Sequence, residues 1–223
     1  MKQITVLIIF LALIISACKK KNNGPATIPI NAGLKADFGY KPGSYWIYKD
    51  SVSGMVDSAY VTDNTIIYRQ LGCAMIAGLP EYEIMAITVR VSDINPTDSE
   101  QWTITLTDSA FSLSLSNNKD VVESELILQP FTYPFRLGNS ALSDGCLMYP
   151  DSACVTDIIP VVSINNQNFS NTVQLNHAGR ANIAAYNDCF YTSPEAGFVK
   201  IVFDHPAVSI HRVLELQRYK IVR

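Results

Sequence analysis

Apolar and polar residues alternate one by one in two neighbouring stretches, and this period of two is the strongest constraint on the fold. In residues 102–107 tryptophan, isoleucine and leucine alternate with threonines, and in residues 111–116 phenylalanine and leucines alternate with serines. Such a period predicts strands with one face in a core and the other in water. Asp108 and Ser109 lie between the two stretches, which predicts a tight hairpin.

Further strands are expected along most of the chain. The pattern predicts them in residues 44–52, 55–63, 65–71, 81–93, 121–131, 172–177, 180–192 and 197–204. Residues 81–93 could begin as a helix, but Ile87, Val89 and Val91 alternate with polar residues, which favours a strand. Residues 208–222 fit neither period perfectly, and their Val, Ile and Tyr favour a strand. Residues 130–160 contain four prolines and two glycines and are expected to be irregular.

These strands predict a mainly β domain with few short helices. Consecutive strands joined by short turns are typical of a single antiparallel meander, curved into a sheet or an open barrel. A β-sandwich is the alternative.

The N-terminus has a different pattern. After a positive start at Lys2, residues 4–15 are apolar except Thr5, and Ser16 and Ala17 follow. A membrane-spanning helix needs about 20 apolar residues, so this run has the size of a signal-peptide core. Residues 1–17 are therefore expected to be a signal peptide, and a buried core helix or a plain secretory signal cut after Ala17 are the alternatives.

The end of this run, Ile15-Ser16-Ala17-Cys18, resembles the lipobox of bacterial lipoproteins. The resemblance implies that the Cys18 thiol receives a diacylglyceryl group and that cleavage makes Cys18 the first residue. A thiol is a good nucleophile for such a modification, and two or more acyl chains anchor a protein stably where one does not.

Residues 18–36 are expected to be a lipidated flexible tether, followed by one β-rich domain over residues 37–223. The tether begins with Lys19, Lys20 and Lys21 and then contains Gly and Pro without periodicity. The lysines either attract anionic headgroups or only keep the tether soluble.

The charge of the domain argues against nucleic acid as a partner. From Asp37 onwards there are twelve Lys and Arg against twenty Asp and Glu, a net charge of −8. Nucleic-acid binding needs clustered basic residues, and none are present.

Four cysteines remain once Cys18 is assigned to lipid. In an exported protein an even set favours disulfides, and sequence alone allows three pairings. The short stretch 146–154, with a turn at Pro150, favours Cys146–Cys154, which leaves Cys73–Cys189. Four free thiols are the alternative, and the absence of any Cys-x-x-Cys pair disfavours zinc.

Residues 40–61, 191–203 and 214–221 resemble uncharacterised envelope lipoproteins of the Bacteroidetes. Their packing motifs, such as Gly43-x-x-Trp46-x-Tyr48, imply a β-rich envelope domain and no particular activity. In that group an acidic run after the lipidated cysteine accompanies export to the cell surface. Here lysines follow Cys18, which favours the periplasmic face of the outer membrane over the cell surface.

Motifs for catalysis, cofactors or metals are weak. Asp204, His205 and His211 would form a metal or acid–base cluster if the two histidines shared a strand face, although a decorated turn is the simpler interpretation. Glu81 with Glu83, and Glu123 with Glu125, have strand spacing and are more simply a solvent face. The chain has no Gly-x-Ser-x-Gly elbow, phosphate loop or His-Glu-x-x-His motif, so no catalytic, cofactor or metal site is assigned.

Aromatic residues offer one further hypothesis. Tyr45, Trp46 and Tyr48 cannot all face one core, and some of Tyr40, Tyr45, Tyr60, Trp102 and Tyr133 would suit a hollow for lipid or glycan. Ordinary core and rim positions are the alternative.

Three functional hypotheses follow. The first is a non-enzymatic envelope lipoprotein, held to the membrane by its lipid, whose domain binds a small ligand or an envelope protein. The second is a hydrolase with a site assembled from distant residues, and the third is a structural envelope component.

Overall fold

The computed structural model describes residues 26–69, 80–92, 100–117, 126–138, 140–141, 152–181, 184–206 and 209–223. Within these ranges the protein is one antiparallel sheet with a single helix, α2 (Ala32–Phe38). The early strands are β1 (Thr27–Ile28), β2 (Tyr45–Asp50), β3 (Val56–Arg69), β4 (Glu81–Ser92), β5 (Glu100–Leu106), β6 (Ala110–Asn117) and β7 (Leu126–Thr132). The later strands are β8 (Ser140–Ala141), β9 (Ser152–Ile164), β10 (Gln167–Ala181), β11 (Ala184–Ser193), β12 (Gly197–His205) and β13 (Ile210–Lys220).

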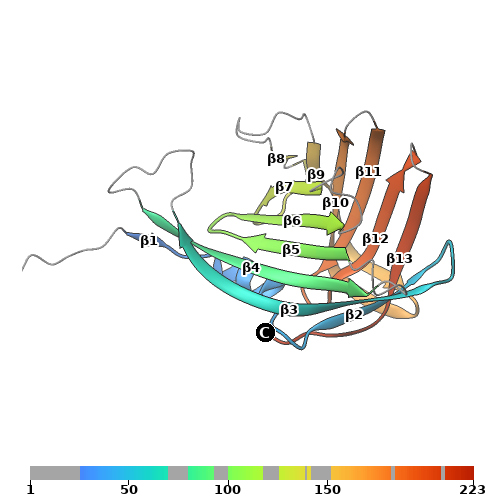
Figure 1. Ribbon diagram of the computed structural model, residues 1–223, viewed down its shortest axis with the longest axis horizontal. Coiled ribbons are helices and arrows are strands. Elements are labelled where there is room, and N and C mark those ends of the chain that lie inside the picture. The colour runs from blue at the N-terminus through green and yellow to red at the C-terminus, as the bar shows by residue number, and fades with distance from the viewer. Residues whose placement is uncertain are drawn as a thin grey trace, which may run out of the picture.

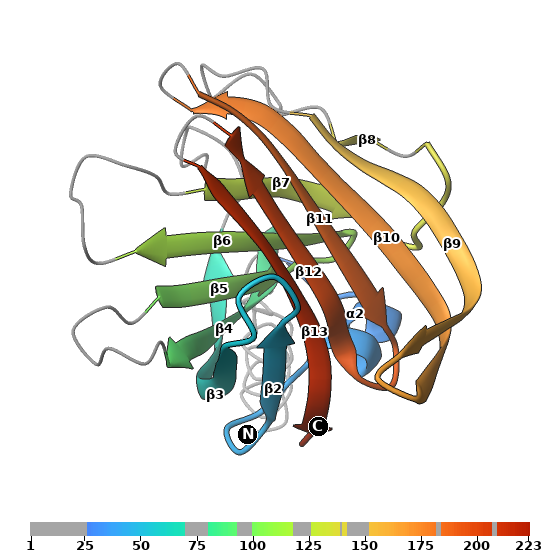
Figure 2. The same ribbon diagram turned by 90° about the vertical axis from the view of Figure 1, so that its right-hand side faces the viewer.

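The strands form an open barrel. Their order is β7-β6-β5-β4-β3-β2-β13-β12-β11-β10-β9-β8. Sequence neighbours therefore pair from β2 to β7 and from β8 to β13, β2 pairs with β13, and the short β1 lies off this path in a parallel pair with β4. The pairing of β2 with β13 joins two meanders, β2 to β7 and β8 to β13. Figures 1 and 2 show these meanders as two walls. β7 packs against β8 and β9 without pairing, which leaves a seam. The predicted curved sheet or open barrel is confirmed, and one continuous sheet replaces the alternative of a β-sandwich.

Both ambiguous segments are strands. Residues 81–92 form β4 throughout, and residues 210–220 form β13 between β2 and β12. In each case pairing on both sides satisfies backbone groups that a helix would have satisfied internally. The predicted hairpin at Asp108 and Ser109 is confirmed between β5 and β6.

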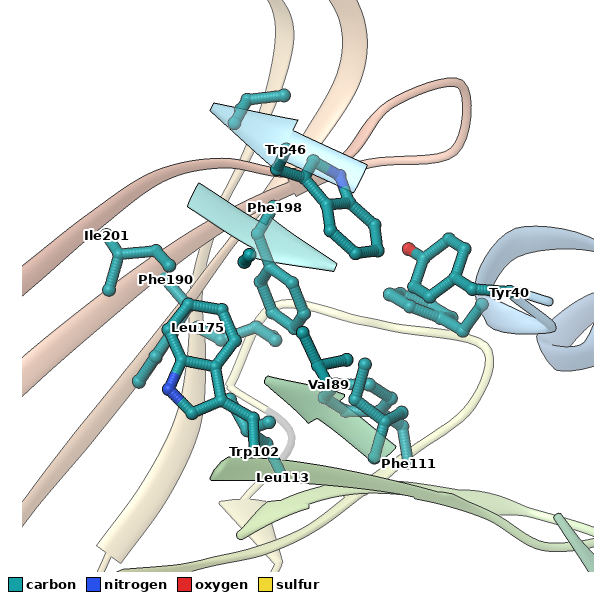
Figure 3. Close-up of a cluster of buried hydrophobic side chains, with 14 of the residues drawn as sticks. Tyr40, Trp46, Val89, Trp102, Phe111, Leu113, Leu175, Phe190, Phe198 and Ile201 are labelled. Carbon is teal, nitrogen blue, oxygen red and sulfur yellow. The ribbon is translucent and has the colours of Figure 1, made fainter. Parts of the chain in front are cut away.

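Large aromatic side chains fill the space between the two walls. The aromatic residues that are at most 2% exposed include Tyr40, Trp46, Tyr48, Trp102, Phe111, Phe131, Phe169, Phe190 and Phe198. Figure 3 shows side chains from both walls meeting around Phe198, whose ring lies 6.2 Å from those of Phe111 and Phe190. Burial of each such ring contributes about 1.5–3 kcal/mol and holds the walls together.

Two aromatic donors fix β2 against the start of β12. Trp46 Nε1 donates to the Ala196 carbonyl at 2.6 Å, and the Tyr48 hydroxyl donates to the Phe198 carbonyl at 2.9 Å. Tyr40 and Trp102 are also buried, so neither lines an open hollow, whereas Tyr60 is exposed. The aromatic residues are therefore chiefly core, as the simpler interpretation held.

Helix α2 closes one end of the barrel, here called the helix end. Asn31 caps the helix, because its side-chain oxygen accepts from the amide of Gly33 at 2.9 Å. Leu34 is fully buried and the Phe38 ring lies 4.6 Å from that of Phe111. The folded part thus begins before the predicted boundary at Asp37, and β1 and α2 occupy residues assigned to the tether. A seven-residue helix has too short an apolar period to be recognised in sequence.

The region expected to be irregular, residues 130–160, is partly a strand. β9 starts at Ser152 and runs through Pro160 to Ile164. Pro160 is tolerated because the β9–β10 register omits it, pairing Ile159 with Thr172 and Val161 with Ser170. A proline has no N–H to donate, so its presence lowers the strand signal without preventing the strand.

Candidate functional site

Five polar or charged side chains lie on the inner face of the sheet, at the end opposite the helix end. They are Asp50 of β2, Asp57 of β3, Arg212 of β13, Asp188 of β11 and His177 of β10. We call them the polar row and this end the polar end. Strand alternation places them inside, because each continues a run of buried residues at every second position, such as Trp46, Tyr48 and Asp50.

Asp50 ties the β2–β3 turn to β13. Its Oδ1 accepts from the amides of Val52 at 3.0 Å and Val213 at 3.2 Å, and its Oδ2 accepts from the Ser53 hydroxyl at 2.8 Å. Burial alone would raise the pKa of this carboxyl. The hydrogen bonds from Ser53, Val52 and Val213, with the nearby charge of Arg212, outweigh burial and lower the Asp50 pKa below its ordinary value.

Arg212 lies between two buried carboxylates. Its Nη2 forms an ion pair with Asp57, and its Nε lies 3.6 Å from Asp50 Oδ2. The Arg212 side chain is 28% exposed, whereas those of Asp50 and Asp57 are each 4% exposed. The guanidinium is therefore the group of this cluster that reaches solvent, and two largely desolvated carboxylates hold it in place.

His177 and Asp188 continue the polar row across the sheet. They are direct partners in the β10–β11 register, and both residues are fully buried. Paired side chains on one face have Cβ atoms about 5 Å apart, close enough for an imidazole to meet a carboxylate. Asp188 Oδ1 also accepts from the Asp204 amide at 3.3 Å, just beyond the last β11–β12 pair at Cys189 and Val202.

A further buried polar atom belongs to Trp102 of β5. Trp102 is 1% exposed, and its Nε1 has no hydrogen-bond partner among the described residues. In Figure 3 this nitrogen lies on the side of the indole that faces away from Phe111. A buried indole N–H without an acceptor costs free energy, so it is a donor available to a bound group.

The polar row combines groups of opposite charge on the inner face of the sheet. It holds three carboxylates against one guanidinium in a poorly solvated setting, where charges interact more strongly than in water. The strand neighbours of His177 are Ala153 on β9 and Asp188 on β11. The register thus gives His177 a carboxylate as its cross-strand neighbour.

The predicted cluster of Asp204, His205 and His211 forms only as a pair. His205 ends β12 and His211 lies on β13, so the two histidines do not share a strand. Asp204 and His211 are register partners on the outer face, with Oδ1 and Nδ1 3.4 Å apart and both side chains exposed. Over the described ranges no three His, Cys, Asp or Glu side chains are grouped to hold a metal ion.

Two of the four cysteines expected to form disulfides lie among the described residues. Cys154 and Cys189 are both free thiols, on β9 and β11, and each is the register partner of Asn176 on the strand between them. Their expected partners, Cys146 and Cys73, lie outside the described residues, as does Cys18. Burial raises the pKa of the Cys189 thiol, which favours the protonated, less nucleophilic form.

Of the two glutamate pairs noted in the sequence, the structure describes the pair Glu81 and Glu83. Glu83 accepts from the Ile30 amide at 3.2 Å and lies 3.7 Å from Lys35 Nζ, so it anchors the start of α2 instead of pairing with Glu81 in a site. Glu123 and Glu125 lie outside the described residues.

Sequence reasoning missed the polar row, although one signal was present. His177 follows Val173 and Leu175 at strand spacing, and Asp188 precedes Phe190 by two, so alternation alone would have placed both inside. The meeting of Arg212 with Asp50 depends on β2 pairing with β13, which no local pattern encodes.

No helix among the described residues is long and apolar enough to span a membrane. Comparisons with protein-family models, with curated proteins and with solved structures found no match.

Proposed function

We propose that this protein is a lipid-anchored envelope protein whose β domain binds a ligand or a partner at its polar end. The anchoring part rests on the signal-like run ending in Ile15-Ser16-Ala17-Cys18. Acylated Cys18 holds the chain at the outer membrane, with the periplasmic face favoured by the lysines that follow.

The polar row carries the binding part of this proposal. A domain that needed only stability would gain by filling these inner positions with apolar residues, because buried ion pairs are often no more stable than well-packed hydrophobic ones. Instead Arg212 contacts Asp50 and Asp57 on the inner face, and the buried residues His177 and Asp188 are cross-strand partners on the same face. Buried polar groups gathered at one end of a barrel are typical of a binding site.

The charge of the row indicates the chemistry of the ligand. Among its five residues the row has three aspartates and one arginine. The row therefore favours a group that is positively charged or rich in hydrogen-bond donors, with an acceptor placed for the Trp102 N–H.

Anchoring is tested by Cys18→Ala. The substitution is expected to abolish labelling by radioactive palmitate and to leave unprocessed or soluble protein. Palmitate labelling that survives the substitution would contradict lipidation at Cys18.

Binding is tested by purifying the native lipoprotein and identifying bound small molecules and proteins by mass spectrometry. The inner pair is altered by His177→Gln with Asp188→Asn. The outer pair provides the matched control, His211→Gln with Asp204→Asn, because it has the same residue types on the opposite face. A ligand or partner retained by the control and lost from the inner-pair variant is the expected result.

A second variant tests the same proposal if the inner-pair variant does not fold. Trp102→Phe keeps the aromatic core and removes only the unpartnered N–H donor, so weaker retention of the ligand is expected from it as well. Recovery of nothing reproducible, or of the same molecules from all variants, would contradict binding at the polar end and favour a structural role.

A further inference from the structure

The β3–β4 ribbon extends past the helix end as an arm. A bulge between Val61 and Asp63 shifts the register, after which β3 continues to Arg69 beside β4. Residues 65–69 are all exposed, and Figure 1 shows β3 and β4 reaching beyond β5 and β6 on the side where β1 lies. This part of β3 is paired along its edge and is not covered on its faces.

Three consecutive residues in the exposed part of the arm are apolar or aromatic. Ile66 is 39% exposed, Ile67 38% and Tyr68 57%. Because consecutive strand residues point to opposite faces, apolar side chains lie on both sides of the ribbon. A strand in water normally carries polar residues on its solvated face, so an apolar surface on both faces indicates a contact with something apolar. The sequence joining β3 to β4, residues 70–79, adds no charged residue.

The chain enters the domain beside the outer end of this arm. β1 pairs in parallel with β4, with Thr27 opposite Glu81 and Ile28 opposite Tyr82, while Arg69 of β3 is opposite Tyr82 on the other side. β1 and the end of β3 are therefore two strand spacings apart, about 10 Å. Eight residues lie between Cys18 and Thr27, and the nine steps from one to the other span at most about 30 Å in a fully extended chain.

We propose that Ile66, Ile67 and Tyr68 form a second membrane contact, which enters the interfacial layer of the bilayer that holds the lipid of Cys18. This inference rests on the proposed lipidation. The short tether brings the arm to the surface, and the side chains suit that layer: Tyr68 is an amphipathic ring, and Arg69 can pair with headgroup phosphate. The contact turns the helix end toward the membrane and the polar end away from it.

The test uses the full mature protein, acylated at Cys18, in phospholipid vesicles with brominated acyl chains. Tyr68→Trp places a reporter on the arm. Val52→Trp is the matched control, because Val52 is also 57% exposed but lies in the β2–β3 turn at the opposite end (Figure 1). The native Trp46 and Trp102 are each 1% exposed and give a constant background.

We expect the tryptophan at position 68 to shift its emission to the blue and to lose most of its intensity to bromine, with no change at position 52. Equal emission from the two positions in vesicle-bound, acylated protein would overturn the arm contact alone. A blue shift without quenching would overturn it in favour of a protein partner covering the arm. Absence of an acyl group on the Cys18 peptide by mass spectrometry would instead overturn the anchoring on which both proposals rest.

Discussion

Arg212 of β13 lies against Asp50 of β2 inside the barrel, with Nε 3.6 Å from Oδ2. These strands come from the two ends of the folded chain, and their pairing joins the two walls. Asp57 of β3 completes the cluster through the Arg212 Nη2. One guanidinium therefore connects three adjacent strands at the polar end.

Removal of Arg212 should destabilise the protein strongly. Arg212→Met keeps much of the side-chain volume but leaves two buried carboxylates without their cation. Breaking a buried ion pair in this way costs about 3–5 kcal/mol, and partial exposure of Arg212 places the expected loss near the lower value. Urea unfolding of the variant and the native protein measures the difference.

The control neutralises the whole cluster. Asp50→Asn and Asp57→Asn added to Arg212→Met should recover part of the lost stability, because no unpaired charge is then buried. A triple variant less stable than Arg212→Met alone would show that hydrogen bonding by the carboxylates outweighs their charge.

Acid should weaken the fold through Asp50. Its folded-state pKa is lowered below the ordinary value of 3.8, so the ionised form stabilises the fold above that value. This stabilisation is lost as the pH falls through the lower, folded-state pKa. Urea midpoints between pH 7 and pH 2 should therefore fall less steeply at the acid end for Asp50→Asn than for the native protein. Parallel curves would assign the acid sensitivity to other carboxylates.

Strands with local alternation could be predicted from the sequence, whereas β9 and the closure of the sheet could not. Alternation in residues 102–116 predicts β5, β6 and their hairpin because each strand buries one face and the turn is local. The pairing of β2 with β13 joins residues such as Tyr48 and Leu216, and their contact depends on the sum of all intervening strand offsets. No pattern within a short window contains that information.

The site was less predictable than the fold, for a related reason. Asp204 and His211 were predicted to lie in one cluster because they are close in sequence. They do lie close together, but on the outer face. His177 and Asp188 meet inside although neither stands in a recognisable motif, because the β10–β11 register sets them opposite each other. A carboxylate in a strand indicates a functional site only if it lies on the buried face, and the local sequence does not show which face that is.

Loss of the Tyr48 hydroxyl should cost a moderate amount of stability. Tyr48→Phe removes the 2.9 Å bond and leaves the Phe198 carbonyl without that donor inside the core. The expected loss is about 1–2 kcal/mol in urea unfolding. Tyr60→Phe, at a residue that is 37% exposed, is the control and should change stability by less than about 0.5 kcal/mol. Equal effects at the two positions would mean that the buried bond contributes nothing.

Gly197 should tolerate alanine less well than Gly54. Both have positive φ, +74° and +77°, so alanine at either carries a backbone cost of about 1 kcal/mol. At Gly54 a new Cβ meets nothing within 4 Å, whereas at Gly197 it would lie 2.5 Å from the Tyr40 hydroxyl oxygen. Gly197→Ala should therefore lose about 1–3 kcal/mol more than Gly54→Ala in thermal or urea unfolding.

The steric part of that loss can be isolated with Tyr40→Phe. The Tyr40 hydroxyl has no hydrogen-bond partner among the described residues, so its removal alone should cost little. Combined with Gly197→Ala it removes the oxygen that the new methyl group meets, and the double variant should be more stable than Gly197→Ala by about 1 kcal/mol. If the losses of stability in the two single variants simply add up in the double variant, the loss from Gly197→Ala comes from the backbone alone. That result would contradict a clash between the new methyl group at position 197 and the Tyr40 hydroxyl.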